Sequence, residues 1–200
     1  MNRHIAVAIT GASGAIHGLR LVEELLLAGC RVSLLISDAG FLVLREECDL
    51  GWSGDAAAIN ASVRAHFRAD GDRLTYYAAN DFRSPLASGS AGADAMVVAP
   101  CSMGTLARIA AGLSGNLLER AADVILKEGR QLVLVPRETP LSAIHLENML
   151  KLARLGVAIV PPMPGFYHQP QTVDDIVNFT VAKVLSRLGL PQQLLQPWGD

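Results

Sequence analysis

The sequence predicts an α/β fold: a doubly wound sheet of about six parallel strands in one domain. Several short runs are apolar without alternation, such as residues 132–135, and such runs are typical of strands buried on both faces of a parallel sheet. Stretches with the helical spacing of apolar residues separate these runs. The expected strands cover residues 4–10, 31–36, 74–77, 95–100, 132–135 and 157–160, within a domain that spans residues 1–190.

The composition argues against several classes of function. Half of the 200 residues are apolar, which is enough for one substantial core. The net charge is −2 and there is no basic cluster, so we expect no nucleic-acid partner. No apolar run approaches the roughly 18 residues of a membrane span, and the N-terminus leads directly into a strand, so we expect a cytoplasmic protein. Three cysteines without CxxC spacing and five scattered histidines predict neither a disulfide framework nor a metal site.

The turn after the first strand, GASGA at residues 11–15, has the composition of a ligand-binding turn. Its glycines, Gly11 and Gly14, let the backbone approach a ligand closely. Ser13 offers a hydroxyl beside the N-terminus of a helix expected over residues 15–28. These features are typical of a phosphate or flavin turn. The turn is not the dinucleotide fingerprint, because the G-x-G-x-x-G spacing is missing.

The second strand also ends in polar residues, Ser37 and Asp38. An acid near this point binds a ribose in NAD enzymes, but that interpretation needs the missing fingerprint. We therefore interpret Asp38 as the cap of a helix over residues 39–47.

The fourth expected strand, over residues 95–100, is followed by Cys101, Ser102 and Thr105 at the start of a helix. This arrangement offers several N–H groups to an anion. Cys101 is a candidate nucleophile, but no base neighbours it in the sequence, and packing is the preferred interpretation. The small polar residues 84–94 suit a loop over a ligand, although linkers have the same composition.

The strand over residues 132–135 ends at Pro136 and leaves two charges, Arg137 and Glu138, between its carboxyl end and the next helix. Ligands of open α/β sheets bind in this crevice. Thr139 is expected to cap the helix, with Pro140 in its first position. The expected inward face of this helix comprises Leu141, Ile144, Met149, Leu152 and Leu155, and Gly156 is expected to end the helix.

The rest of the chain contains further side chains that can bind an anion, namely three cations and one tyrosine. Arg120 and Lys127 lie one heptad apart in a predicted helix, close to the same face. Tyr167 lies in a proline-rich loop, and proline lowers the entropy that is lost when such a loop is ordered. Lys183 lies at the edge of the apolar stripe of the last helix, which starts at a capping box formed by Thr172. There it either extends to water or meets an anion.

The C-terminal tail, residues 191–200, carries Leu194, Leu195 and Trp198 beyond the end of the last helix. These side chains cannot continue the buried face of that helix, and a monomer would hide them poorly. We expect the tail to pack on a neighbouring subunit.

Six segments together resemble the UbiX-type flavin prenyltransferases over nearly the whole chain: GASGAIHGLRLVEEL, ASGS at residues 87–90, CSMGTLARIAAG, NLLERAADVILKE, LVLVPRETPLSAIHLENMLKL and PGFYHQPQTVDDIV. The resemblance implies a three-layer, doubly wound Rossmann-like fold of the homo-oligomeric flavin-containing decarboxylase type, often dodecameric. It implies transfer of a dimethylallyl group from dimethylallyl phosphate to N5 of reduced FMN, followed by ring closure to C6. The product, prenylated FMN, would serve a partner decarboxylase, and no metal is needed.

The resemblance also assigns residues. Those expected to bind FMN are Gly11, Ala12, Ser13, Ser37, Ser88, Ser102, Met103, Gly104, Thr105 and Arg137. Glu47, Glu138 and Ser13 are the expected catalytic residues, and Arg120, Lys127, Tyr167 and Lys183 are those expected around the prenyl phosphate. The chain departs from the family at two positions, where His17 replaces a frequent tyrosine and Lys183 replaces a frequent arginine. Lysine keeps the charge but loses the bidentate fork.

Two other functions compete with the prenyltransferase. The same fold hosts FMN-dependent decarboxylases that act directly on an acid, since fold does not settle chemistry. Such an enzyme would have little use for a set of cations with a tyrosine. A non-catalytic FMN carrier would explain the turns but would leave Glu138, Tyr167 and Lys183 without a role.

Overall fold

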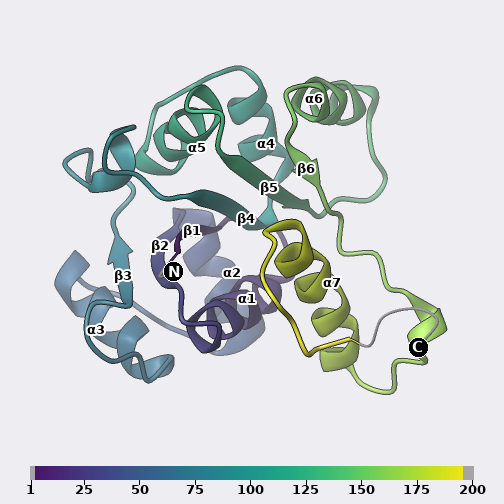
Figure 1. Cartoon of the computed structure of the whole chain (residues 1–200), viewed down its shortest axis with the longest axis horizontal. Coiled ribbons are helices and arrows are strands. Elements are labelled where there is room, and N and C mark those ends of the chain that lie inside the picture. Colours follow the sequence, from purple (N-terminus) through teal and green to yellow (C-terminus); the bar gives the residue numbers. More distant parts are fainter. Residues whose placement is uncertain (1–2, 196–200) are drawn as a thin grey trace.

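The computed structural model describes residues 3–195, which form one parallel six-stranded sheet with helices on both faces (Figure 1). The strands are β1 His4–Ile9, β2 Arg31–Ile36, β3 Leu74–Tyr77, β4 Ala95–Cys101, β5 Gln131–Pro136 and β6 Ala158–Ile159. Their order in the sheet is β3-β2-β1-β4-β5-β6, so β1 pairs with β4 although β2 and β3 separate them in the sequence. The predicted doubly wound α/β class is confirmed.

Seven α-helices and two short 3-10 helices connect the strands within the described residues. They are α1 Ala15–Leu27, α2 Asp38–Cys48, α3 Ala56–His66, η1 Pro85–Ala87, α4 Met103–Ala110, α5 Leu117–Lys127, α6 Ala143–Arg154, η2 Phe166–His168 and α7 Val173–Arg187. None of the helices found between residues 3 and 195 has the length and apolar character needed to cross a membrane.

Side chains alternate across the sheet and fill two separate cores. In β1, Ile5, Val7 and Ile9 belong to the core shared with α1, α3 and α7, whereas Ala6 and Ala8 belong to the core shared with α4, α5 and α6. The molecule therefore has three layers, and α5 and α7 lie on opposite faces of the sheet (Figure 1).

The predicted start of α2 differs by one residue from the start in the structure, whereas the predicted start of α7 is correct. Ser37, not Asp38, caps α2: its Oγ accepts a hydrogen bond from the N–H of Gly40 at 3.0 Å, and Asp38 is the first helical residue. A serine one residue earlier can reach the same N–H, and an acid in the first turn suits the helix dipole. The predicted capping box of Thr172 and Asp175 is confirmed.

Helix α6 begins later than predicted, at Ala143 rather than after Thr139. Ser142 is its cap and forms a reciprocal capping box with His145, which Thr139 does not form. The predicted inward face is also wrong for the most part. Of its five residues Leu152 is buried and Met149 is half-buried, whereas Leu141, Ile144 and Leu155 are 40, 68 and 62% exposed. The helix packs along one side against α4, so only a narrow strip is covered.

Candidate functional site

The carboxyl ends of β1 and β4 meet at the point where the strand order reverses, which is where ligands of this architecture bind. Thr10 fixes the two ends to each other. Its hydroxyl donates to the carbonyl of Pro100 at 2.8 Å and accepts from the N–H of Ser102 at 2.8 Å. The turns after β1 and β4, both predicted as ligand turns, therefore lie side by side.

The turn after β1 is closed by a carboxylate from α2. The Oε2 atom of Glu47 accepts hydrogen bonds from the N–H groups of Gly14 at 2.8 Å and Ala15 at 3.2 Å. Burial by itself raises the pKa of Glu47, but the hydrogen bonds from the Ser13 hydroxyl and from these two N–H groups outweigh it, so the pKa lies below its usual value. The N-terminus of α1 thus already holds an anion, and that anion is part of the protein.

Arg137 joins this group from the end of β5. Its Nε donates to the carbonyl of Ser13 at 3.3 Å, and its charge contributes to the lowered pKa of Glu47. The structure therefore brings three of the predicted residues together: Ser13, Glu47 and Arg137. Glu138 follows as an exposed residue that accepts from the N–H of Thr139.

A cavity of about 340 Å³ opens beside these turns on the β2 side. Four predicted flavin residues line it: Gly11, Ser37, Ser102 and Thr105. Two other members of the predicted set lie elsewhere, because the side chains of Ala12 and Met103 are only 5 and 7% exposed and pack inward. Ala12 and Met103 could therefore meet a ligand only through their backbone.

Sequence reasoning missed three side chains of this cavity: Arg108, Asn116 and Glu119. Arg108 and Glu119 form an ion pair between α4 and α5, with 2.7 Å between Nε and Oε1. Nothing in the sequence links two charges that are eleven positions apart on different helices. Asn116 caps α5, and its side-chain oxygen accepts a hydrogen bond from the N–H of Glu119 at 2.9 Å.

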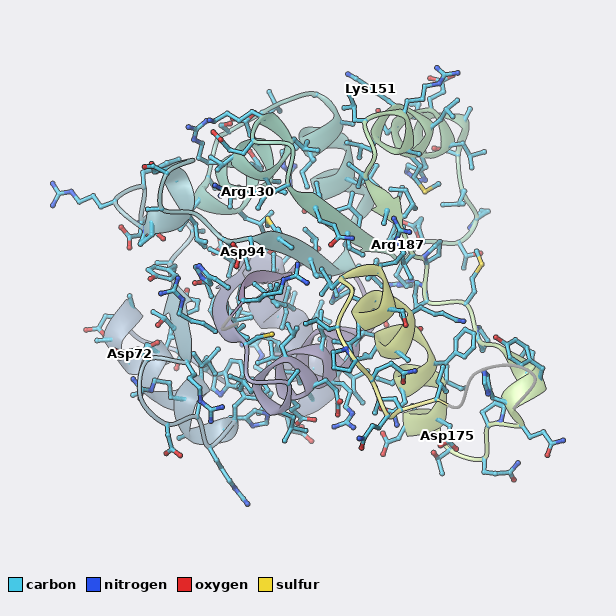
Figure 2. All side chains as sticks on the ribbon, in the orientation of Figure 1. Asp72, Asp94, Arg130, Lys151, Asp175 and Arg187 are labelled. Carbon is cyan, nitrogen blue, oxygen red and sulfur yellow. The ribbon has the colours of Figure 1, made fainter. Side chains whose placement is uncertain are left out.

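Ser88, Arg120 and Lys127 form a second group, on α5 and the loop after η1. Arg120 donates to the carbonyl of Ala87 at 3.1 Å and pairs with Asp123 at 2.6 Å. Lys127 pairs with its neighbour Glu128. Arg130, labelled in Figure 2, holds the same loop through the carbonyls of Ala93 and Gly89.

Tyr167 and Lys183 form a third group around Phe179 of α7. The rings of Tyr167 and Phe179 are 5.8 Å apart in an edge-on arrangement, and the Nζ of Lys183 lies 5.2 Å from the centre of the Phe179 ring. This group and the Arg120–Lys127 group lie on opposite faces of the sheet (Figure 1). One chain therefore does not bring all the predicted phosphate-binding residues together.

Burial shifts the pKa values of two residues near these turns, Cys101 and His17. Cys101 is fully buried, and burial raises the pKa of its thiol to about 12, which supports the packing interpretation. Burial also lowers the pKa of His17, whose Nδ1 lies 3.1 Å from the carbonyl of Gly14. The other ring nitrogen of His17 is buried without a hydrogen-bond partner among residues 3–195.

The parallel sheet, its switch-point cavity and the hydroxyl-bearing helix starts define a doubly wound α/β protein that binds a nucleotide-like ligand. Similarity to known proteins identifies the family within this class. The model of the Flavoprotein family matches residues 1–185. The flavin prenyltransferase UbiX of Pseudomonas aeruginosa is 50% identical over 196 residues, which is 98% of this chain and 94% of the relative.

Two solved structures are similar over nearly their whole length. The AnUbiX (PadA1) complex with FMN and dimethylallyl pyrophosphate has a TM-score of 0.88 and 38% identity, covering 100% of this chain and 99% of that one. A dodecameric FMN-dependent UbiX-like decarboxylase from Escherichia coli O157:H7 has a TM-score of 0.84 and 44% identity, covering 98% of this chain and 100% of that one. The chain belongs to the Flavoprotein family, within its UbiX flavin prenyltransferase group.

Proposed function

We infer that this protein is a flavin prenyltransferase that uses dimethylallyl phosphate and reduced FMN and releases prenylated FMN. The observation that carries this inference is the whole-length similarity to UbiX enzymes, one of which is a complex with FMN and a prenyl pyrophosphate. The residues present fit FMN, because hydroxyl-bearing helix starts and a cation line the switch-point cavity. Reduced FMN supplies the nucleophile N5, and later C6 for ring closure.

We propose that the cations and the phenol act on the leaving phosphate. The bond from the allyl carbon to the phosphate oxygen breaks as the bond to N5 forms, and the phosphate leaves with the electron pair. Without a metal, this charge has to be held by protein donors, which we assign to Arg120, Lys127, Tyr167 and Lys183. Each of these side chains carries a proton that it can donate in a hydrogen bond.

Glu47 and Glu138 are assigned to proton transfer, with Ser13 positioning Glu47. The hydrogen bonds from Gly14 and Ala15 keep the Glu47 carboxylate ionised and fix its direction, so it is suited to accept a proton. Ring closure would add a proton to the CH carbon of the allyl double bond, form the bond from C6 to its tertiary carbon and release the proton of C6, so one acid and one base are needed. Glu138 lies one residue after Arg137 at the same edge of the sheet.

We propose that the complete site forms between subunits of a homo-oligomer. The two phosphate-binding groups lie on opposite faces of the sheet in one chain, so a second copy has to supply one of them. The dodecameric E. coli relative supports this arrangement, and we propose a dodecamer here.

The C-terminal tail is part of the same proposal. Leu194 packs partly against its own core and, with Leu195, lines a cavity of about 360 Å³ next to the η2 loop; Trp198 lies outside the described residues. We propose that residues 192–200 complete the site from a neighbouring subunit. Deleting them should lower the prenylation rate more than the melting temperature, and full activity with unchanged assembly mass would contradict this.

We further propose a cytoplasmic enzyme whose product passes to a decarboxylase that depends on prenylated FMN.

The decisive experiment incubates the protein without oxygen with FMN, dithionite and dimethylallyl phosphate, and then measures the mass and absorbance of the released flavin. We expect a flavin heavier by one dimethylallyl group. Omitting the prenyl phosphate is the matched control.

The same experiment tests the competing functions. Flavin recovered unchanged, together with loss of CO₂ from an added unsaturated aromatic acid, would favour the direct decarboxylase. Unchanged flavin and no turnover of either compound would favour the carrier.

A further inference from the structure

Four helix N-termini lie at the switch-point cavity and the β1 turn beside it, and they differ in charge. The N-terminus of α1 is occupied by the Glu47 carboxylate, and that of α2 carries Asp38 in its first turn. The N-terminus of α5 carries Glu119, whose charge is paired with Arg108. Helix α4 has no acid in its first turn. An anionic ligand is repelled by the first two carboxylates and attracted by the N–H groups of α4.

A cation stands beside the N-terminus of α4. Side chains of a helix point back toward its N-terminus, so Arg108 extends along α4 over Gly104, one turn earlier. Its Nη1 and Nη2 atoms lie 3.8 and 4.0 Å from the place where a Cβ of Gly104 would be. Both Nη atoms lack a hydrogen-bond partner within the described part of the chain, and the side chain is half exposed.

Glu119 fixes the direction of this guanidinium. Its carboxylate is 4% exposed and all its partners are in place: Oε1 accepts from Arg108 and from Asn116 at 2.9 Å, and Oε2 accepts from the N–H of Gly115 at 2.8 Å. Because Arg108 uses only Nε for this pair, the outer edge of its fork is left for a ligand. A buried carboxylate with full partners holds the cation in place without competing for that edge.

We propose that Arg108, positioned by Glu119, binds the phosphate of FMN in the cavity lined by Ser37, Ser102 and Thr105. This places the phosphate at α4 and leaves the turn with Ser13 and Glu47 for the uncharged ring system. The inference rests on the proposed use of FMN, but it concerns binding of the flavin and not its prenylation.

The test compares FMN with riboflavin, which has the same ring and ribityl chain but no phosphate. Dissociation constants of both are measured without a prenyl donor for the wild type, Arg108→Gln and Arg108→Ala. We expect each substitution to weaken FMN binding about tenfold or more while riboflavin binding is unchanged, because one charge-assisted hydrogen bond is lost. Glutamine can still donate to Glu119, so Arg108→Gln keeps that buried carboxylate satisfied if the alanine variant folds poorly.

Arg45→Ala is the matched control, because Arg45 is an exposed arginine of α2 paired only with Glu46 among the described residues. It should leave the FMN-to-riboflavin ratio at the wild-type value. Glu119→Gln should weaken FMN binding by a smaller factor than Arg108→Ala and spare riboflavin.

Three results would overturn the proposal. One is an unchanged FMN-to-riboflavin ratio in both Arg108 variants. Another is equal affinity of the wild type for the two flavins. The third is a raised KM for dimethylallyl phosphate with FMN binding unaffected, which would assign Arg108 to the prenyl phosphate. Failure to prenylate FMN would contradict the proposed function but would leave these binding ratios as they are.

Discussion

At the scale of single residues, Glu47 caps a helix distant from it in the sequence, in addition to its proposed catalytic role. It lies in the last turn of α2, where a solvated carboxylate is common, yet it caps α1 through two backbone N–H groups. The same hydrogen bonds that hold α1 in place also keep Glu47 ionised. The capping role of Glu47 and its proposed catalytic role therefore depend on the same hydrogen bonds, and comparing stability with turnover can separate the two roles.

We predict that Glu47→Ala lowers stability at pH 7 by about 1 kcal/mol, the usual loss for a removed helix cap. The folded-state pKa of Glu47 is below the ordinary value of 4.5, so its contribution is present above pH 4.5 and is lost as pH falls through the lower folded-state pKa. Urea unfolding of both proteins at several pH values should show the difference shrinking in acid.

The matched control is Glu46→Ala, because Glu46 is exposed and pairs only with Arg45 among the described residues. It should change stability little at any pH, as expected for a surface ion pair. A gap between wild type and Glu47→Ala that stayed constant down to strongly acid pH would refute the capping role.

At the scale of elements, the β1 turn depends on close packing as well as on ligand approach. A Cβ added at Gly11 would overlap the Cβ of Ala39 in α2, and that atom is fixed to the backbone. The glycine therefore lets the turn rest directly on α2, which brings Ser37 and Ser102 into one cavity. Ligand approach was the predicted reason for this glycine, and helix packing is an additional one.

We predict that Gly11→Ala destabilises the protein by about 1 to 3 kcal/mol, the range for overpacking a fixed site, and weakens FMN binding as α2 shifts. Gly51→Ala is the control, since a Cβ there meets nothing within 4 Å. Melting temperatures and FMN titrations of both variants are the measurements. If Gly11→Ala and Gly51→Ala had equal melting temperatures, the turn and α2 would be able to move apart without loss of stability.

The elements also show how far the sequence could predict the structure. The sheet was largely predictable because β1, β4 and β5 contain continuous apolar runs, and the short length of these runs favours strands over helices. Helix α6 was mispredicted, because its apolar residues at helical spacing were assumed to face the core of the same chain. Leu152 does, but Ile144 and Leu155 are exposed. Periodicity identifies an apolar face but not what covers it.

The candidate site was predictable only where it follows strand ends. Ser37, Ser102 and Arg137 each come directly after a strand, and parallel strands bring such positions to one edge. The Arg108–Glu119 pair joins two helices on one face of the sheet, and the cap that Glu47 provides spans two helices. Such contacts depend on how helices are placed, which local spacing does not encode.

At the scale of the whole molecule, Lys127 and Lys183 lie on helices that pack on opposite faces of the sheet. Helix α5 packs on one face of the sheet and α7 on the other, so both lysines of one chain cannot hold one small phosphate (Figure 1). If both act on the same leaving group, they must come from different subunits. Each subunit then contributes to at least two sites.

We predict that Lys127→Ala and Lys183→Ala each lose at least tenfold in prenylation rate alone but regain activity when both chains are co-expressed and purified as mixed oligomers. Both changes are structurally mild, because Lys127 is half exposed and pairs with its sequence neighbour, and Lys183 is exposed beside Phe179. If the lysines come from different chains, about one site in four of an equal mixture has both intact. Mixtures of each variant with itself are the controls. Activity of the mixed oligomers no higher than that of either variant would mean that one chain supplies both residues, and the shared site would have to be abandoned.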